Sequence, residues 1–261
     1  MASTPLAPAD VPGEPSTGVI FATRSYALRA VRFDSPFIIV VLSGAKRLDG
    51  QRCEKGEFLV VHRASAADVE NLPTASEPYR GWAIPFRWEL VDIARTLVSK
   101  RIRSTDARRM THGERSLIEP ELRALLAVDA SDSARKDHAV LGVMLALVRA
   151  GHSGFLDARE ERLEARVRAL VSEAPARPWN SAMLERLLHV SGATLRRKLA
   201  SEDTSLREVV TEARLHHAVA LLQTRTLPLK TVAAQSGYRS VHAFSRQFEA
   251  RFGVDPMTVK R

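Results

Sequence analysis

The sequence predicts a multidomain α+β protein, in which an N-terminal β-barrel is followed by helices and then by an all-α C-terminal domain with a double helix-turn-helix. Three observations support this fold class. Residues 18–88 contain short apolar bursts separated by turn-forming residues, which is the pattern of successive strands. After residue 89 the apolar residues recur at helical spacing. Residues 179–261 contain one arrangement of short helix, turn and longer helix twice.

The N-terminal part of the chain divides into an arm and a barrel. Residues 1–17 are rich in Pro, Ala, Ser and Thr and have no hydrophobic periodicity, so we expect a disordered arm. Residues 18–88 are expected to form a regulatory barrel. Its strands are separated by pairs such as Asp49-Gly50 and Lys55-Gly56, which suit tight turns because Gly tolerates positive φ.

Residues 89–173 are expected to form a helical region that serves dimerisation or connects the domains. Its last segment, residues 159–173, places Leu163, Val167 and Leu170 on one stripe. The stripe can pair with a second copy of the chain or lie on its own domain, and the pattern is the same in both cases. Residues 174–178 break the helix with two prolines and predict a linker, so the C-terminal domain is expected over residues 179–261.

The charge of the chain points toward polyanionic partners. The formal net charge is +9, and residues 176–261 contain 14 Lys and Arg against 7 Asp and Glu. Such an excess favours nucleic acid or an acidic membrane surface. No apolar run is long enough to span a bilayer, and the N-terminus lacks the basic and apolar regions of a secretory signal, so a cytoplasmic protein is expected. Cys53 is the only cysteine, which excludes intramolecular disulfides and thiolate metal cages.

The repeat in the C-terminal domain is the most specific feature of the sequence. The first copy spans residues 183–202 and the second spans residues 229–251. Between them, residues 205–224 predict a helix of about 30 Å, which is close to one turn of B-DNA at about 34 Å. One chain is therefore expected to reach two successive major-groove segments on the same face of a duplex.

The second helix of each copy carries the candidate DNA-binding residues. Leu195 and Leu199 face inward in the first copy, as do Phe244 and Phe248 in the second, which turns the intervening polar residues outward. An ordinary solvated helix face gives the same pattern for any single Arg. The base-reading candidates are Ala193, Thr194, Arg196, Arg197, Val241, His242, Ala243 and Arg246, and the phosphate-binding candidates are Ser191, Lys198, Lys230, Arg239, Ser240 and Gln247.

Residues 178–261 contain, in order, Trp179, Thr194 to Leu199, Gly237-Tyr238, Phe244 to Phe248 and Pro256. With these segments they resemble the AraC/XylS-type transcriptional regulators. The resemblance implies base-reading positions that fall on Ala193, Arg196, Arg197, Val241, His242 and Arg246. It also implies that the N-terminal barrel is cupin-like and that the helices after it dimerise.

The barrel offers little for catalysis or for metal binding. The metal site of a metal-binding cupin resembles a His-x-His pair with a nearby Glu and a later His. Residues 18–88 contain only one histidine, His62, which is expected at the surface at a strand end. No catalytic triad pattern is found either, so we expect no enzyme activity, no metal and no cofactor. The resemblance implies a small-molecule effector with a carboxylate, for which Arg24, Arg29, Arg32 and Lys46 are candidates unless these strand residues face solvent.

These observations predict a cytoplasmic, nucleoid-associated regulator of transcription that binds DNA sequence-specifically and activates in response to a small molecule. Its expected partners are double-stranded promoter DNA, RNA polymerase, an effector and a second copy of the chain in a homodimer, with no membrane. One alternative is a nonspecific nucleoid-associated DNA-binding protein, for which basic charge suffices. A second is a metal-dependent cupin enzyme with an appended DNA-binding domain. The sequence does not identify the target promoter or the effector.

Overall fold

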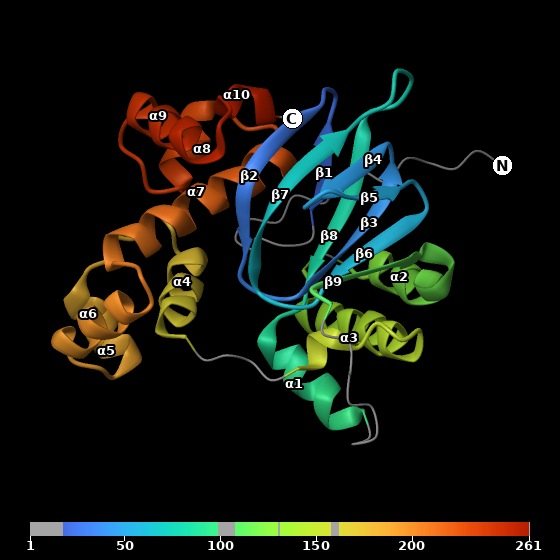
Figure 1. The fold of residues 1–261 in the computed structure, drawn as a ribbon, viewed down its shortest axis with the longest axis horizontal. Helices are drawn as coiled ribbons and strands as arrows, with labels where there is room; N and C mark the ends of the chain where they lie inside the picture. The colour runs from blue at the N-terminus through green and yellow to red at the C-terminus, as the bar shows by residue number, and fades with distance from the viewer. Residues whose placement is uncertain (1–17, 99–107, 130, 158–161, 261) are drawn as a thin grey trace. The chain divides into compact units, whose positions relative to one another are not determined.

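The computed structural model describes residues 18–98, 108–129, 131–157 and 162–260 (Figure 1). The predicted arm, residues 1–17, lies outside these described residues. The chain forms two compact units, which we call the sheet unit and the reading unit. The sheet unit comprises Met1–Arg24, Ser35–Ala64 and Asn71–Asp157, and the reading unit comprises Ser25–Asp34, Ser65–Glu70 and Ala158–Arg261.

The described strands form two sheets. One has the order β1-β8-β3-β6-β9 and the other has the order β2-β7-β4-β5. The strands are β1 (Val19–Ala22), β2 (Tyr26–Phe33), β3 (Phe37–Ser43), β4 (Ala45–Leu48), β5 (Gln51–Glu54), β6 (Glu57–Val61), β7 (Ser65–Leu72), β8 (Tyr79–Pro85) and β9 (Met110–Glu114). The strand-rich N-terminal part is confirmed, but the closed barrel is not, because among the described residues β1 and β9 end the five-stranded sheet as edges.

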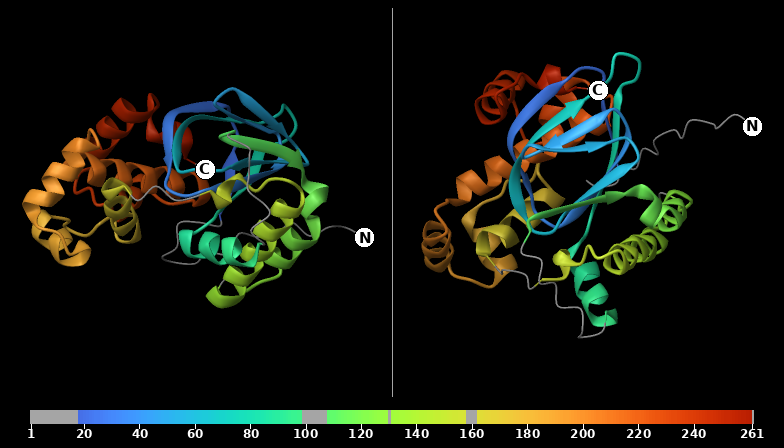
Figure 2. Two further views of the ribbon diagram at one scale, coloured as in Figure 1. Left: turned by 60° about the horizontal axis from the view of Figure 1, so that its bottom comes forward. Right: turned by 45° about the vertical axis from the view of Figure 1, so that its right-hand side comes forward.

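Helices cover one face of the five-stranded sheet, as the two views of Figure 2 show. They are α1 (Trp88–Leu97), α2 (Glu119–Leu126) and α3 (Ser133–Arg149), with short 3₁₀ turns at Arg115–Ile118 and Gly154–Leu156. Alternate strand residues such as Ile38, Val40 and Phe58 pack against Val143 and Met144 of α3 in one apolar core. Because side chains alternate along a strand, this face is apolar every second residue.

The reading unit is mainly helical. Its helices are α4 (Leu163–Glu173), α5 (Ser181–Leu188), α6 (Gly192–Ser201), α7 (Leu206–Thr224), α8 (Leu229–Gln235), α9 (Val241–Phe252) and α10 (Pro256–Val259). The stripe of α4 packs against α6 and α7, and its Leu163 and Val167 belong to the core that Leu195 and Leu199 complete. This stripe therefore lies on its own domain and is covered within the chain, so it gives no support to dimerisation.

None of the helices in the described part of the chain has the length and the apolar composition that crossing a membrane requires.

Candidate nucleic-acid interface

The first helix-turn-helix consists of α5 and α6, and short polar side chains set where its helices begin. The Asn180 side chain accepts a hydrogen bond from the Met183 N–H at 3.0 Å, and Ser191 Oγ accepts one from the Thr194 N–H at 3.2 Å. Both caps satisfy amides that have no partner inside the helix. Between the helices His189 adopts the left-handed conformation with φ 54°, which ends α5 and turns the chain. The orientation of α6 follows from these local constraints.

The second helix-turn-helix consists of α8 and α9. Gly237 in its turn has φ +81°, and a Cβ atom there would lie 2.7 Å from Arg214 Nε and from the Pro175 carbonyl oxygen. Only glycine therefore fits this turn. Ser240 then begins α9, and its Oγ accepts from the Ala243 N–H at 3.3 Å.

An aromatic row fixes the buried side of α9. The ring centroids of Phe244 and Phe248 lie 5.6 Å apart, and those of Phe248 and Phe252 lie 4.8 Å apart. All three rings are fully buried. Rings spaced by one helical turn stack into the core, so the opposite side of α9 faces solvent.

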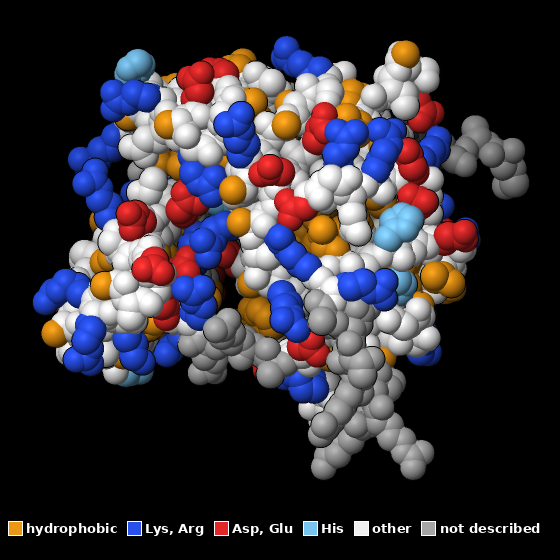
Figure 3. Space-filling view, in the orientation of Figure 1, with side chains coloured by type: hydrophobic (Ala, Val, Ile, Leu, Met, Phe, Trp, Pro, Cys, Tyr) orange, Lys and Arg blue, Asp and Glu red, His pale blue; other side chains and the backbone are white. Residues whose placement is uncertain are grey.

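The predicted DNA-binding residues lie on the solvent-facing sides of the two helix-turn-helix units. Leu195 and Leu199 are buried as expected, and Arg196 and Arg197 between them are exposed. Thr194, Val241 and Ala243 are half-buried, whereas the exposed candidates are Ser191, Ala193, Arg196, Arg197, Lys198, Lys230, Arg239, Ser240, His242, Arg246 and Gln247. Figure 3 shows Lys and Arg side chains at the surface over α5 and α6.

The arginines on these two faces are available to a ligand. Among the described residues, Arg196, Arg197 and Arg246 have no ion-pair partner, although Arg side chains elsewhere in the chain commonly do. Gln247 differs, because its Oε1 accepts a hydrogen bond from the Tyr238 hydroxyl at 3.1 Å and leaves only its amide hydrogens to donate. The arrangement can thus present several unpaired guanidinium groups to an anion or to base edges.

Side chains that the sequence did not single out hold α9 in place. Arg251, near its end, donates to Glu212 Oε1 of α7 at 2.5 Å and to the carbonyl oxygens of Arg29 and Ala30 in β2 at 3.2 and 2.9 Å. The strand β2 belongs to the reading unit, so this clamp lies within one unit. The only sequence signal for this clamp was an Arg at the edge of the buried face of α9. An Arg at such a position is too common to predict a specific contact.

His216 of α7 joins β2 by a second contact. Its Nε2 accepts from the Arg32 N–H at 2.6 Å, and its Nδ1 donates to the Glu212 carbonyl oxygen at 2.7 Å. Burial lowers the pKa of His216 to about 4, against the opposing effect of Glu212. The imidazole is therefore neutral at pH 7, which its role as an acceptor requires.

The four effector candidates have different surroundings. Arg24 and Arg29 are exposed, and Arg32 forms an ion pair with Glu164 of α4 at 2.9 Å. Lys46 alone is buried, and its Nζ donates to Asn71 Oδ1 at 2.7 Å. An effector site on these residues stays a prediction.

His62 is not the surface residue that the sequence predicts. It is buried, its Nε2 lies 2.8 Å from Thr111 Oγ1, and its ring stacks on that of Phe155. The same hydroxyl lies 2.8 Å from His152 Nδ1. The prediction was wrong because β9 and the turn at Gly154 cover the end of β6, and both come from distant parts of the sequence.

Comparison with known proteins supports the helix-turn-helix assignment. Residues 184–261 match the model of a helix-turn-helix domain family. Two curated relatives from Escherichia coli are the HTH-type transcriptional regulator YdeO, 31% identical over 96 residues, and the HTH-type transcriptional regulator GadX, 30% identical over 102 residues. These matches cover 37% and 39% of this chain and only 38% and 37% of the relatives, so the chain spans less than two thirds of their length.

Solved structures resemble nearly the whole chain. Apo ToxT from Vibrio cholerae superposes with a TM-score of 0.63 at 17% identity, over 92% of this chain and 94% of that one. A second ToxT structure, described as bound to an unsaturated fatty acid, gives a TM-score of 0.60 at 15% identity over 92% of each chain. At this identity the likeness establishes the fold, a sheet-rich N-terminal part followed by a helical C-terminal domain. The family match assigns a helix-turn-helix domain to residues 184–261, the part of the chain whose sequence resembles the AraC/XylS-type regulators.

Proposed function

We propose that the protein is a transcription regulator that binds double-stranded DNA sequence-specifically through α6 and α9. The observation that carries the proposal is the presence of two capped helices in one unit, of which α6 exposes Arg196 and Arg197 and α9 exposes Arg246, all three without an ion-pair partner among the described residues. An isolated basic surface would account for nonspecific binding alone.

The length of the helix between α6 and α9 suits contact with two neighbouring segments of the DNA major groove. They are joined by α7, whose 19 residues span about 28 Å at 1.5 Å per residue. One turn of B-DNA is about 34 Å, so α6 and α9 suit two successive major-groove segments. Arg196, Arg197 and Arg246 would donate to guanine, and Ala193 and Val241 would contact thymine methyl groups.

The remaining candidates would position the domain on the backbone. Lys198, Lys230 and Arg239 are exposed beside the two faces and would neutralise phosphates. Ser191 and Ser240 begin the two helices, where amides and the helix dipole also favour a phosphate.

The wider function follows the relatives. Curated relatives are transcriptional regulators, and a ToxT structure contains a fatty acid, which supports regulation by a small molecule. We therefore include in the proposal an effector, transcriptional activation through RNA polymerase, a homodimer and action at the bacterial nucleoid. Enzyme activity forms no part of it.

The test begins with DNA selected from a random library by the full-length protein. Affinity for the selected site and for a scrambled copy is then measured at one salt concentration. Arg196→Ala and Arg246→Ala should each weaken binding to the selected site by roughly 5- to 150-fold, equivalent to about 1–3 kcal/mol, and leave binding to scrambled DNA much less changed.

Arg135→Ala is the matched control, because Arg135 lies on α3 and loses the same charge from an exposed position. Its affinity should equal that of the wild type. Equal wild-type affinity for selected and scrambled DNA would instead establish a nonspecific nucleoid protein. A uniform loss on both sequences would show that Arg196 and Arg246 contact phosphate alone.

A further inference from the structure

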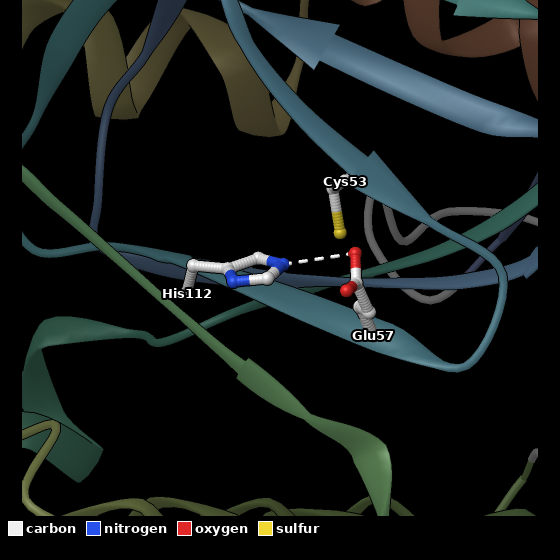
Figure 4. A group of neighbouring side chains, drawn as sticks. All are labelled: Cys53, Glu57 and His112. Carbon is white, nitrogen blue, oxygen red and sulfur yellow. Dashed lines mark ion pairs between the residues drawn. The ribbon is translucent and has the colours of Figure 1, made fainter.

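Three side chains with metal-binding atoms meet in the sheet unit, which contains no residue of the helix-turn-helix units. They are Cys53 of β5, Glu57 of β6 and His112 of β9 (Figure 4). The Cys53 sulfur, a Glu57 carboxylate oxygen and a His112 ring nitrogen all lie within 4.8 Å of one another. A thiol, a carboxylate and an imidazole that converge from three strands form a set of donors that transition metals bind.

Strand register explains how residues so far apart in the sequence come together. In the pairing of β6 with β9, Leu59 lies opposite His112 and Glu57 lies opposite Glu114. Glu57 and His112 are therefore diagonal neighbours on one face of the sheet, within reach of long side chains. Gly56, with φ +88°, makes the turn that leads from β5 back into β6 and brings Cys53 to the same place.

The orientation of Glu57 is already fixed. Its Oε2 accepts a hydrogen bond from the Glu54 N–H at 2.6 Å and lies 2.9 Å from His112 Nε2. A backbone donor that holds a carboxylate is the kind of second interaction that orients metal ligands. Cys53 is buried, Glu57 is half-buried and His112 is exposed, so the cluster is closed on the sulfur side and open on the other.

An open hollow borders the cluster at Glu57. Its volume is about 960 Å³, and Glu57 lines it together with Lys55, Glu114, Arg115, Glu119 and Arg123. An ion can thus reach Glu57 from solvent without unfolding of the sheet, and a metal site requires such a path.

We propose that Cys53, Glu57 and His112 bind one zinc ion, with a fourth position open to water or to a small anion. Zinc accepts sulfur, nitrogen and oxygen at about 2.0–2.3 Å, which places the ligand atoms about 3.3–3.8 Å apart and asks for shifts of about 1 Å here. Magnesium and calcium prefer all-oxygen sites, which this cluster is not. As the Zn–S bond forms, the thiol proton of Cys53 passes to solvent. The ion also takes the place of the proton that His112 Nε2 shares with Glu57, and this proton passes to solvent or, in a neutral imidazole, is replaced by one on Nδ1.

The experiment uses the full-length protein after treatment with a chelator and removal of that chelator. Cobalt(II) is titrated as a spectroscopic probe, and zinc is then added to displace it. One equivalent of cobalt should bind and produce the near-ultraviolet charge-transfer band of a cobalt thiolate, which zinc abolishes at one equivalent. This measurement uses only the wild-type protein, so its result does not depend on whether a variant folds.

Variants then assign the ligands. Cys53→Ser should remove the charge-transfer band, and Glu57→Gln and His112→Gln should each weaken zinc binding at least tenfold. His138→Gln is the matched control, because His138 is exposed on α3 outside the cluster, and it should bind zinc like the wild type.

A wild-type protein that gives no thiolate band with cobalt would overturn the proposal. Folded His112→Gln protein, judged by circular dichroism, with unchanged zinc affinity would overturn it as well. Neither result concerns DNA, so the site stands or fails independently of the proposed function.

Discussion

Lys46 is a basic side chain held inside the sheet unit. It is 3% exposed, donates to Asn71, and lies over the Tyr79 ring with 5.3 Å between Nζ and the ring centroid. Burial lowers the pKa of Lys46 to about 7. An unfolded Lys keeps its ordinary pKa, so between pH 7 and 10.5 the unfolded chain binds more protons than the folded one, and stability must rise with pH.

Replacing Lys46 tests this relation directly. From pH 7 to pH 9 the wild type should gain roughly 2 kcal/mol in free energy of unfolding in total, because folded Lys46 is still half protonated at pH 7, while Lys46→Met lacks this gain. Urea unfolding at each pH measures the difference. The range stops at pH 9 because burial also raises the pKa of Cys53 above its ordinary 9.0, so at higher pH the unfolded thiol loses its proton first and stability falls. Parallel profiles for the two proteins would mean that Lys46 titrates normally.

Lys46 and His62 also mark the limit of prediction for single residues. Leu195, Leu199, Phe244 and Phe248 were predicted inward and are 1%, 1%, 0% and 0% exposed, because helical spacing leaves one choice of buried face. A strand has two faces, and both can be covered. Nothing local indicates that β9 and the turn at Gly154 cover His62.

At the scale of single elements, N-terminal caps position α6 and α9, the two helices proposed to contact DNA. The sequence predicted these helices from residues 193 and 240, and they run over Gly192–Ser201 and Val241–Phe252. The agreement is within one residue because Ser191 and Ser240 signal the start of each helix. The strand β9 was missed, since its short polar sequence becomes a strand only by pairing with β6.

Ser240 separates the role of a cap from a role in DNA binding. Ser240→Ala should cost about 1 kcal/mol of stability through loss of the hydrogen bond to Ala243, measured by thermal unfolding. Ser240→Asp should keep the stability, because Asp also caps, yet should weaken DNA binding by placing a negative charge near phosphate. Undiminished DNA affinity in Ser240→Asp would place this helix start away from the backbone.

The contact between β2 and α7 should be sensitive to acid. Neutral His216 accepts from the Arg32 N–H, and its pKa of about 4 lies below the ordinary 6.5. Between these values the unfolded chain binds more protons, so stability is lost as the pH falls from 6.5 to 4, by up to about 3 kcal/mol from this residue.

His216→Gln removes this titration and retains a side chain able to accept. Urea unfolding at pH 6.5 and 4.5 should show a smaller acid loss for this variant than for the wild type. His217, whose pKa burial also lowers, titrates in both proteins and cancels from the difference, and His138→Gln serves as the control. Equal acid losses in wild type and His216→Gln would exclude His216 as the cause.

At the scale of the molecule, the distribution of charge along the chain agrees with the proposal that the C-terminal domain binds DNA. Most of the +9 formal charge lies in residues 176–261, which hold both helix-turn-helix units. The α+β class, the order of the parts and the double helix-turn-helix could be predicted because they follow from local periodicity and a repeat. Whether the strands close into a barrel could not be predicted, because closure depends on pairing between distant strands. Among the described strands β9 lies at an edge of its sheet, so the predicted closed barrel is not found.

Phosphate contacts should make DNA binding strongly dependent on salt. A plot of the logarithm of affinity against the logarithm of salt concentration should be linear, and Lys198→Ala or Lys230→Ala should each lower its slope by about 1. The same variants should leave the preference for the selected site unchanged. Anisotropy titrations at four salt concentrations measure both quantities, and a slope unchanged by either substitution would remove that Lys from the backbone contacts.

The central claim is that one chain reads DNA with two helices. Methylation protection of guanine N7 on the selected site, with full-length protein, tests it most directly. The account predicts two protected major-groove segments about 10 base pairs apart, with Arg196→Ala losing protection in one segment and Arg246→Ala in the other. A single protected segment, or equal loss of both segments in each variant, would contradict it.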